Sequence, residues 1–169
     1  QELVSIENLI PGRPLSEVLP TLSSADKRIA LRHYLAALRT LHTIECPDKP
    51  YGELLTTRLI TASTWPGYLS AHIHKAVTEY GIEADVSEVE AVAAKTLEVV
   101  KELQNTPKAL VHGDYGPANV LVGADLQVTG VIDFSGMTVV GDPFLDVAAA
   151  VLFLEVTAGH VPEDSEIAH

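Results

Sequence analysis

Residues 111–122 have the sequence VHGDYGPANVLV, and residues 131–134 have the sequence VIDF. Short apolar runs bounded by Gly, Pro, Asp and Asn are typical of buried strands joined by tight turns. Asp114 lies in the turn, Asn119 begins the next strand, and Asp133 lies at the end of a further one. A carboxylate that ends an apolar strand requires a cation or a hydrogen-bond donor as its partner. The two stretches therefore predict strands that carry a polar site.

These three side chains fit the needs of phosphoryl transfer, which requires an aligned acceptor hydroxyl and divalent cations that neutralise the phosphates. Asp114 can accept a hydrogen bond from that hydroxyl and act as the catalytic base. Asn119 offers a neutral oxygen and Asp133 a charged one, and both are hard donors that suit Mg²⁺. Taken alone, Asp114 and Asn119 are more typical of ordinary turn residues. The presence of Asp133 in register with them favours the catalytic interpretation.

Hydrophobic periodicity predicts a largely helical chain outside these stretches. Helices are predicted over residues 24–45, from about 68 to 80, from about 86 to 104, and from 144 to about 156. Strands are predicted over residues 3–10, 109–112, 119–122 and 127–134. Residues 11–14, with the sequence PGRP, are expected to break the first strand. Helices followed by short strands and a last helix indicate an α+β domain.

The composition is that of a globular protein without an internal disulfide. The chain has 169 residues, of which 47% are hydrophobic, with a net charge of -12 and one cysteine. The longest apolar run, residues 147–154, is too short to span a membrane. Residues 109–169 include nine acidic residues and no Lys or Arg, which disfavours nucleic-acid binding because that binding relies on cationic contacts with phosphates. The sequence thus predicts no membrane partner, no nucleic-acid partner and a cytoplasmic location.

Three ordered motifs resemble those of the aminoglycoside phosphotransferase and choline kinase-like family. They are the H-G-D-x-x-x-x-N of residues 112–119, the I-D-F of residues 132–134 and the GDPFLDVA of residues 141–148. Three motifs in this order are far more specific than a single triplet. The resemblance implies an α+β, protein kinase-like fold. This chain would form its mostly helical C-terminal lobe, with a small β-hairpin patch that carries the catalytic loop.

The resemblance also implies a domain organisation. Residues 1–12 would form the hinge strand and linker, whose backbone groups bind the nucleotide base. The residues expected to make that contact are Glu7, Asn8 and Leu9. Residues 13–169 would form the helical lobe, with the catalytic and metal-binding loop at 109–148. Because the sequence holds neither a glycine-rich phosphate loop nor a strand lysine, an N-terminal lobe is expected upstream of residue 1.

The activity implied by the resemblance is that of a small-molecule kinase with an alcohol group as acceptor. Asp114 would be the catalytic base, and Asn119 and Asp133 would bind Mg²⁺. The γ-phosphate of ATP or GTP would move to a hydroxyl of the acceptor. The acidic C-terminal half favours a cationic acceptor such as an aminoglycoside, although an acidic surface also serves solubility alone.

Two other functions fit parts of the sequence. A non-catalytic nucleotide-binding or regulatory kinase-like module would keep the lobe without transferring phosphate. A metal-dependent hydrolase would use His112, Asp114, Asp133 and Asp142 as ligands, but it gives Asn119 no special role.

The neighbouring residues receive structural interpretations. His112 is expected to fix the shape of the loop through its imidazole, since the adjacent carboxylate already fits the role of base. The resemblance suggests that Asp142 and Asp146 brace the loop from the following helix, and Asp142 is also a typical helix N-terminal acid. Tyr115 is interpreted as a surface or core residue.

Overall fold

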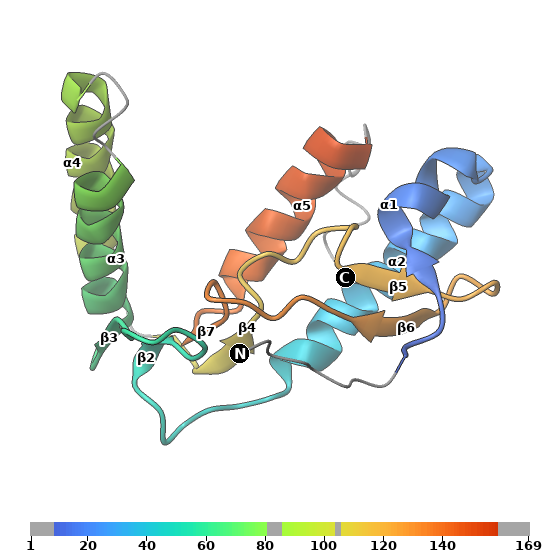
Figure 1. The fold of residues 1–169 in the computed structure, drawn as a ribbon, viewed down its shortest axis with the longest axis horizontal. Helices are drawn as coiled ribbons and strands as arrows, with labels where there is room; N and C mark the ends of the chain where they lie inside the picture. Colours follow the sequence, from blue (N-terminus) through green and yellow to red (C-terminus); the bar gives the residue numbers. More distant parts are fainter. Residues whose placement is uncertain (1–8, 81–85, 104–105, 159–169) are drawn as a thin grey trace, which may run out of the picture. The chain divides into compact units, whose positions relative to one another are not determined.

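The computed structural model of the chain describes residues 9–80, 86–103 and 106–158. The chain divides into two compact units, each with its own antiparallel sheet. Unit 1 comprises residues 1–40, 114–133 and 146–169, and unit 2 comprises residues 41–113 and 134–145. The combination of helices with two small sheets confirms the predicted α+β class (Figure 1).

Within the described residues, the sheet of unit 1 has three strands in the order β1-β5-β6. These strands are β1 (Arg13–Pro14), β5 (Val120–Val122) and β6 (Val128–Val131). The helices of this unit are α1 (Leu15–Val18), the 3-10 helix η1 (Leu19–Thr21), α2 (Ser24–His42, up to residue 40) and α5 (Phe144–Ala158, from residue 146). Its fully buried apolar side chains include Leu15, Tyr34, Tyr115, Val120 and Leu154.

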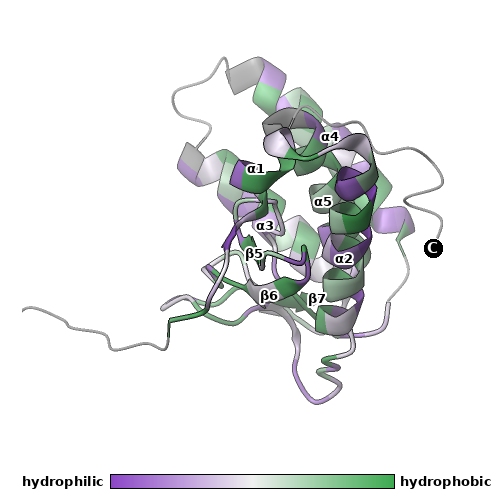
Figure 2. Cartoon of the chain, turned by 90° about the vertical axis from the view of Figure 1, so that its right-hand side faces the viewer, coloured by the Kyte–Doolittle hydropathy of each residue, from purple (hydrophilic) through white to green (hydrophobic). Residues whose placement is uncertain are grey.

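Helix α2 begins at the predicted residue because its first turn is capped from outside. The hydroxyl of Ser23 accepts a hydrogen bond from the backbone N–H of Asp26 at 3.2 Å and donates one to the Asp26 carboxylate at 2.7 Å. This exchange satisfies a backbone donor that the helix leaves without a partner. Figure 2 shows hydrophilic and hydrophobic residues mixed along the ribbon of α2, which is the amphipathic character that predicted it.

Helix α2 ends at His42, three residues before the predicted end. The residues after His42 pair with the strand β4 (Ala109–Val111) and with the residue before it instead of extending the helix. Glu45 forms an isolated bridge with Ala109, and the N–H of Cys46 donates to the carbonyl of Lys108 at 2.9 Å. Tertiary hydrogen bonds therefore override the helical periodicity at this end.

In the part of unit 2 that the structure describes, the sheet has four strands in the order β3-β2-β7-β4. Besides β4, its strands are β2 (Tyr51–Glu53), β3 (Thr61–Ala62) and β7 (Val139–Gly141), and its helices are α3 (Trp65–Tyr80) and α4 (Val86–Glu102). Helices α3 and α4 pack along each other (Figure 1). A core cluster joins the sheet to α3, and its buried members are Tyr51, Trp65, Tyr68, Val111 and Val139.

Helix α3 begins three residues earlier than predicted, because Trp65-Pro66-Gly67 forms its first turn instead of preceding the helix. The hydroxyl of Thr64 accepts the N–H of Gly67 at 3.2 Å, and its carbonyl accepts the N–H of Tyr68 at 3.1 Å. Proline is suited to a first turn, since its missing N–H would have no partner there. The Trp65 ring then lies against Gly141, where a Cβ atom would come within 2.5 Å of the indole.

The short strands were the least predictable elements. Strands β4, β5 and β6 confirm the predicted strands, although β6 ends at Val131 rather than at residue 134. Strands β2, β3 and β7 are two or three residues long and were not predicted. The predicted break at residues 11–14 was wrong in part, because Arg13 and Pro14 pair with Val122 and Leu121. Proline is tolerated there because β1 is an edge strand.

Tyr68 should make the stability of unit 2 sensitive to alkaline pH. Burial, and after it the charge of Glu53, raises the pKa of Tyr68 from 10.0 to about 12. Because the folded protein then holds this proton more tightly than the unfolded chain, the free energy of unfolding is unaffected below pH 10 and falls as the pH rises toward 12. The fall due to this one group is at most about 3 kcal/mol, since each unit of difference in pKa is worth about 1.4 kcal/mol.

Denaturant unfolding at several alkaline pH values measures this dependence. Tyr68→Phe should show a shallower fall, because the variant lacks the titrating hydroxyl. An identical pH profile in Tyr68→Phe and in the unaltered protein would contradict the prediction.

Candidate active site

The turn that follows β4 requires glycine at position 113. Gly113 has a φ of +83°, in the left-handed region, and a Cβ atom there would come within 2.1 Å of the Met137 carbonyl oxygen. Glycine alone enters this region without steric cost. His112, which like Gly113 belongs to unit 2, is fully buried. Its carbonyl accepts a hydrogen bond from the Thr138 hydroxyl at 3.2 Å, and its ring centroid lies 4.6 Å from that of Phe134. Burial among these neighbours fits a structural residue, and the expected role of the imidazole in fixing the loop stays a prediction.

Residues 114–119 of unit 1 form a loop that is closed by its own backbone. The N–H of Gly116 donates to the carbonyl of Asp114 at 2.9 Å, and the N–H of Asn119 donates to the carbonyl of Gly116 at 3.0 Å. The N–H of Ser16, in α1, donates to the carbonyl of Pro117 at 3.0 Å. These bonds give the loop a defined shape ahead of β5.

Asn119 holds Asp114 through its side chain. The Nδ2 atom of Asn119 donates to the Asp114 backbone carbonyl at 2.9 Å and to Oδ2 of the Asp114 carboxylate at 3.1 Å. Because both partners are acceptors, the nitrogen of the amide must face them. The Oδ1 atom of Asn119 is then the atom with which this residue can bind a cation. Both side chains are half-buried, so Asp114 is fixed without being sealed from solvent.

The hairpin of β5 and β6 brings Asp133 to the same end as Asn119. Val120 pairs with Val131, and the N–H of Ile132 donates to the carbonyl of Asn119 at 2.9 Å. Asp133 follows directly, with a φ of +65°. A non-glycine residue in this region is uncommon, and such outliers cluster at functional sites.

The environment of Asp133 differs from the expected one. The sequence placed it at the end of an apolar strand, where burial would demand a partner, but β6 ends at Val131 and Asp133 is exposed. The Asp133 carboxylate is therefore accessible to a ligand from solvent.

A pair of tyrosines that was not predicted from the sequence anchors this loop to α2. The hydroxyl of Tyr34 donates to the Tyr115 carbonyl at 2.9 Å, and the hydroxyl of Tyr115 donates to the Tyr34 carbonyl at 2.8 Å. Their ring centroids lie 4.8 Å apart. The spacing of 81 residues left no local signal of the pairing. Burial raises the pKa of both phenols far above the ordinary value, and the charge of buried Asp146 raises both further.

Asp142 confirms its predicted place at the start of α5. Its Oδ1 atom accepts the N–H of Phe144 at 2.9 Å, and its carbonyl accepts the N–H of Leu145 at 3.1 Å. These are the contacts of a helix-capping residue. Asp146, one turn later, is fully buried in unit 1, where its charge acts on Tyr34 and Tyr115. That proximity fits the suggestion that Asp146 braces the loop.

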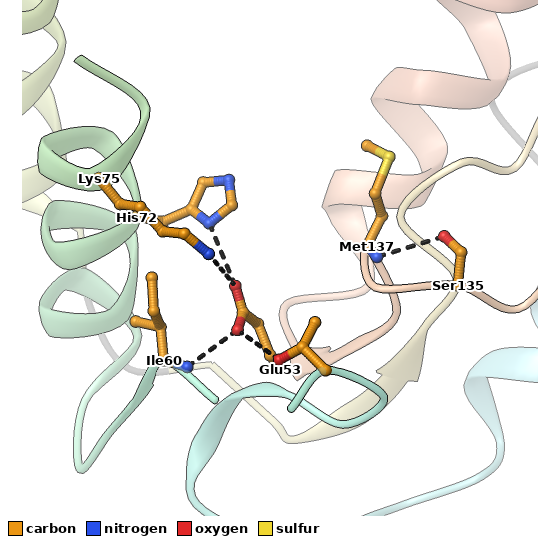
Figure 3. Close-up of polar contacts among 7 residues, drawn as sticks. Glu53, Ile60, His72, Lys75, Ser135 and Met137 are labelled. Carbon is orange, nitrogen blue, oxygen red and sulfur yellow. Dashed lines mark hydrogen bonds and ion pairs between the residues drawn. The ribbon is translucent and has the colours of Figure 1, made fainter. Parts of the chain in front are cut away.

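Unit 2 holds a second polar cluster, around the buried carboxylate of Glu53 (Figure 3). Its Oε2 atom accepts the N–H of Ile60 and the hydroxyl of Thr56, both at 2.9 Å. Its Oε1 atom lies 3.8 Å from Nζ of Lys75 and 3.8 Å from Nδ1 of His72, both on α3. Four partners meet the requirement of a buried charge. Glu53, the last residue of β2, therefore connects the loop that follows β2 to α3. These contacts explain its burial by a structural role.

The predicted nucleotide contacts lie at the edge of the described chain. Glu7 and Asn8 lie outside the described residues, and Leu9 has 95% of its surface exposed. Ile10 contacts β6, since a Cβ atom on Gly130 would come within 2.8 Å of its Cγ2. The contact of Glu7, Asn8 and Leu9 with a base stays a prediction.

Two classes of feature are absent from the described part of the chain. Residues 9–80, 86–103 and 106–158 hold no helix with the length and apolar character of a membrane span. They also hold no group of three or more His, Cys, Asp or Glu side chains that could bind a metal ion together.

Comparisons with solved structures identify the fold. The crystal structure of an aminoglycoside-3'-phosphotransferase of type VIII is similar with a TM-score of 0.64 and 22% identity, over 95% of this chain and 57% of that chain. A thermostable mutant of aminoglycoside phosphotransferase APH(4)-Ia, in ternary complex with AMP-PNP and hygromycin B, has a TM-score of 0.62 and 22% identity, over 86% and 48%. APH(3'')-Id from Streptomyces rimosus, in complex with ADP and streptomycin, has a TM-score of 0.57 and 17% identity, over 95% and 58%.

The chain thus spans about half the length of these solved structures. At such identities the likeness shows a shared fold. No curated protein matches the chain. The sequence profile of the phosphotransferase enzyme family, however, matches residues 8–166. Because this match covers almost the whole sequence, the chain belongs to the phosphotransferase enzyme family.

Proposed function

We propose that the chain carries the catalytic loop of a small-molecule kinase, which moves the γ-phosphate of ATP or GTP to a hydroxyl group. One observation carries the proposal. The amide of Asn119 bonds to the Asp114 carboxylate while the β5–β6 register brings Asp133 to the same end of the hairpin. A base and two metal-binding oxygens are the groups that phosphoryl transfer needs at one place.

Asp114 is the proposed catalytic base. Its carboxylate accepts the proton of the acceptor hydroxyl as the acceptor oxygen bonds to the γ-phosphorus, and the bond to the leaving nucleoside diphosphate breaks. The hydrogen bond from Asn119 orients the carboxylate before substrate arrives. Such positioning lowers the entropic cost of reaching the transition state.

Asn119 and Asp133 are the proposed ligands of Mg²⁺. The donor set fits the ion, since an amide oxygen and a carboxylate oxygen are hard ligands and Mg²⁺ is bound through one or two carboxylates together with substrate phosphates. Nδ2 of Asn119 is already bonded to Asp114, which leaves Oδ1 for the ion. When bound, Mg²⁺ supplies neutralisation of the phosphate charge.

The domain organisation belongs to the same proposal. Residues 13–169 form the helical lobe, and residues 1–12 form the hinge that contacts the base. Complexes of two structural neighbours with AMP-PNP and ADP support a nucleotide as the phosphate donor. The glycine-rich lobe that grips the phosphates would lie outside this sequence.

The proposed acceptor is a small cationic molecule of the aminoglycoside or amino alcohol class. The absence of Lys and Arg from residues 109–169, together with their nine acidic residues, favours a cationic partner for this part of the sequence. Two structural neighbours are complexed with hygromycin B and streptomycin. Both observations support a cationic acceptor rather than an anionic one.

A transfer assay tests the function. The intact protein is incubated with γ-labelled ATP or GTP, Mg²⁺ and separate aminoglycosides, amino alcohols and neutral sugars. We expect acceptor-dependent release of nucleoside diphosphate and label on a cationic acceptor, both abolished by EDTA. Magnesium-dependent nucleotide binding without transfer to any acceptor would instead favour the non-catalytic module. Transfer to sugars alone would contradict the acceptor class while leaving the kinase assignment intact.

A further inference from the structure

The tyrosine pair of unit 1 bonds to the backbone of the loop beside Asp114. The carbonyl of Tyr115 and the N–H of Gly116 belong to one peptide group, and both are bonded. The carbonyl accepts the Tyr34 hydroxyl at 2.9 Å, and the N–H donates to the Asp114 carbonyl at 2.9 Å. Tyr34 therefore holds one side of the peptide group whose other side holds Asp114.

The same hydrogen bonds lead on to the carboxylate. The Asp114 carbonyl that accepts Gly116 also accepts Nδ2 of Asn119, and that nitrogen bonds to the Asp114 carboxylate. A continuous path thus runs from the Tyr34 hydroxyl, through the peptide after Tyr115, to the Asp114 side chain. Hydrogen bonds linked in this way are worth more together than singly.

The two hydrogen bonds between Tyr34 and Tyr115 are reciprocal and buried. Each hydroxyl donates to the backbone carbonyl of the other residue, so the two bonds form one ring. Both side chains have 0% of their surface exposed, and tilted ring packing accompanies the bonds. Phenol hydroxyls are protonated, and so able to donate, throughout the neutral range, and the raised pKa of both phenols extends this to more alkaline pH.

We propose that the hydroxyls of Tyr34 and Tyr115 are positioning groups for phosphoryl transfer, which fix the peptide after Tyr115 and thereby the Asp114 carboxylate. The proposal rests on the proposed function, because it assigns Asp114 the role of base. Neither hydroxyl touches substrate in this arrangement. Their effect is on the orientation of Asp114, and so on the rate of transfer rather than on substrate binding.

Tyr34→Phe and Tyr115→Phe in the intact protein separate the hydroxyls from the rings. Each change keeps the aromatic packing and removes one bond of the ring. We expect kcat to fall about tenfold, since small misplacements of a catalytic group have effects of this order. The KM for nucleotide should change by less than about twofold, because a transition-state interaction is lost rather than a binding contact. The double variant should resemble each single one, since the two bonds act as a unit.

Tyr51→Phe is the matched control. Tyr51 is also a buried tyrosine whose hydroxyl donates to a backbone carbonyl, that of Thr106, but it belongs to unit 2. The Tyr51→Phe variant should lose about as much thermal stability as Tyr34→Phe and Tyr115→Phe, without any change in kcat. Amide hydrogen exchange adds a structural readout, because the N–H groups of Gly116 and Asn119 should exchange faster in the Tyr34 and Tyr115 variants and at an unchanged rate in Tyr51→Phe.

The outcomes distinguish this inference from the function on which it rests. A lower kcat at steady KM, with faster exchange of the two loop amides, supports it. An active protein whose kcat is unchanged in both variants, or falls equally in Tyr51→Phe, overturns the inference and leaves the kinase assignment standing. An unaltered protein that binds nucleotide but transfers no phosphate overturns both.

Discussion

Asp114→Asn in the intact protein should lower the turnover of phosphoryl transfer by about two to four orders of magnitude while leaving nucleotide affinity within about twofold. The substitution removes the proton acceptor and little else. An asparagine oxygen can still accept the hydrogen bond that Nδ2 of Asn119 gives to the Asp114 carboxylate. The loop should therefore keep its shape, and the loss should fall on kcat.

The measurement is kcat with magnesium-nucleotide and an acceptor, beside the dissociation constant of magnesium-nucleotide from calorimetry. Asp125→Asn provides a matched control. Asp125 is an exposed carboxylate in the β5–β6 turn, where its Oδ1 accepts the N–H of Gln127 at 3.1 Å, a bond that an asparagine can also make. This variant should retain full turnover. Retained turnover in Asp114→Asn would show that Asp114 is not the catalytic base.

The sequence predicted those elements whose information is local. Helices α2, α4 and α5 carry long amphipathic or apolar runs, and the capping residues Ser23 and Asp142 mark the starts of α2 and α5. Strands β4 and β5 are apolar runs set off by turn residues. The motif residues Asp114, Asn119 and Asp133 could be chosen because their spacing is a property of the sequence.

The features that were missed depend on partners distant in the chain. Strand β7 pairs with both β2 and β4, and its three residues give no period of their own. The Tyr34–Tyr115 ring and the ion pair of Glu53 with Lys75 join residues that no short window of sequence includes together. The exposure of Asp133 was misjudged for a related reason, because neither the early end of β6 at Val131 nor the left-handed backbone at Asp133 leaves a trace in hydropathy.

The left-handed backbone at Asp133 determines which substitution can test its role. A left-handed backbone penalises alanine, whereas asparagine tolerates it nearly as well as aspartate. Asp133→Asn therefore removes the charge while keeping the φ of +65° that the loop requires. Folding should survive, since the side chain is exposed and contributes no core packing. A thermal unfolding curve close to that of the unaltered protein would establish this.

Asp133→Asn should weaken magnesium-dependent nucleotide binding by about tenfold to a hundredfold, since a contact with a charged group contributes about 1.5–3 kcal/mol. Asn119→Ala should weaken it less, because it removes a neutral oxygen while the charged one stays. It should nevertheless lower turnover, since the same side chain holds the Asp114 carboxylate at 3.1 Å. The two substitutions are thus expected to have different effects. Asp133→Asn should mainly weaken nucleotide binding, whereas Asn119→Ala should affect both binding and turnover.

Calorimetric titration of each variant with nucleotide, in Mg²⁺ and in EDTA, decides the matter. Affinity in EDTA should be the same in all proteins, because the proposed contacts of Asn119 and Asp133 with nucleotide run through the ion. Affinity in Mg²⁺ should rank the unaltered protein first, Asn119→Ala second and Asp133→Asn last. An Asp133→Asn variant that binds magnesium-nucleotide as tightly as the unaltered protein would place the metal on other residues, and the left-handed turn at Asp133 would then need an explanation outside metal binding.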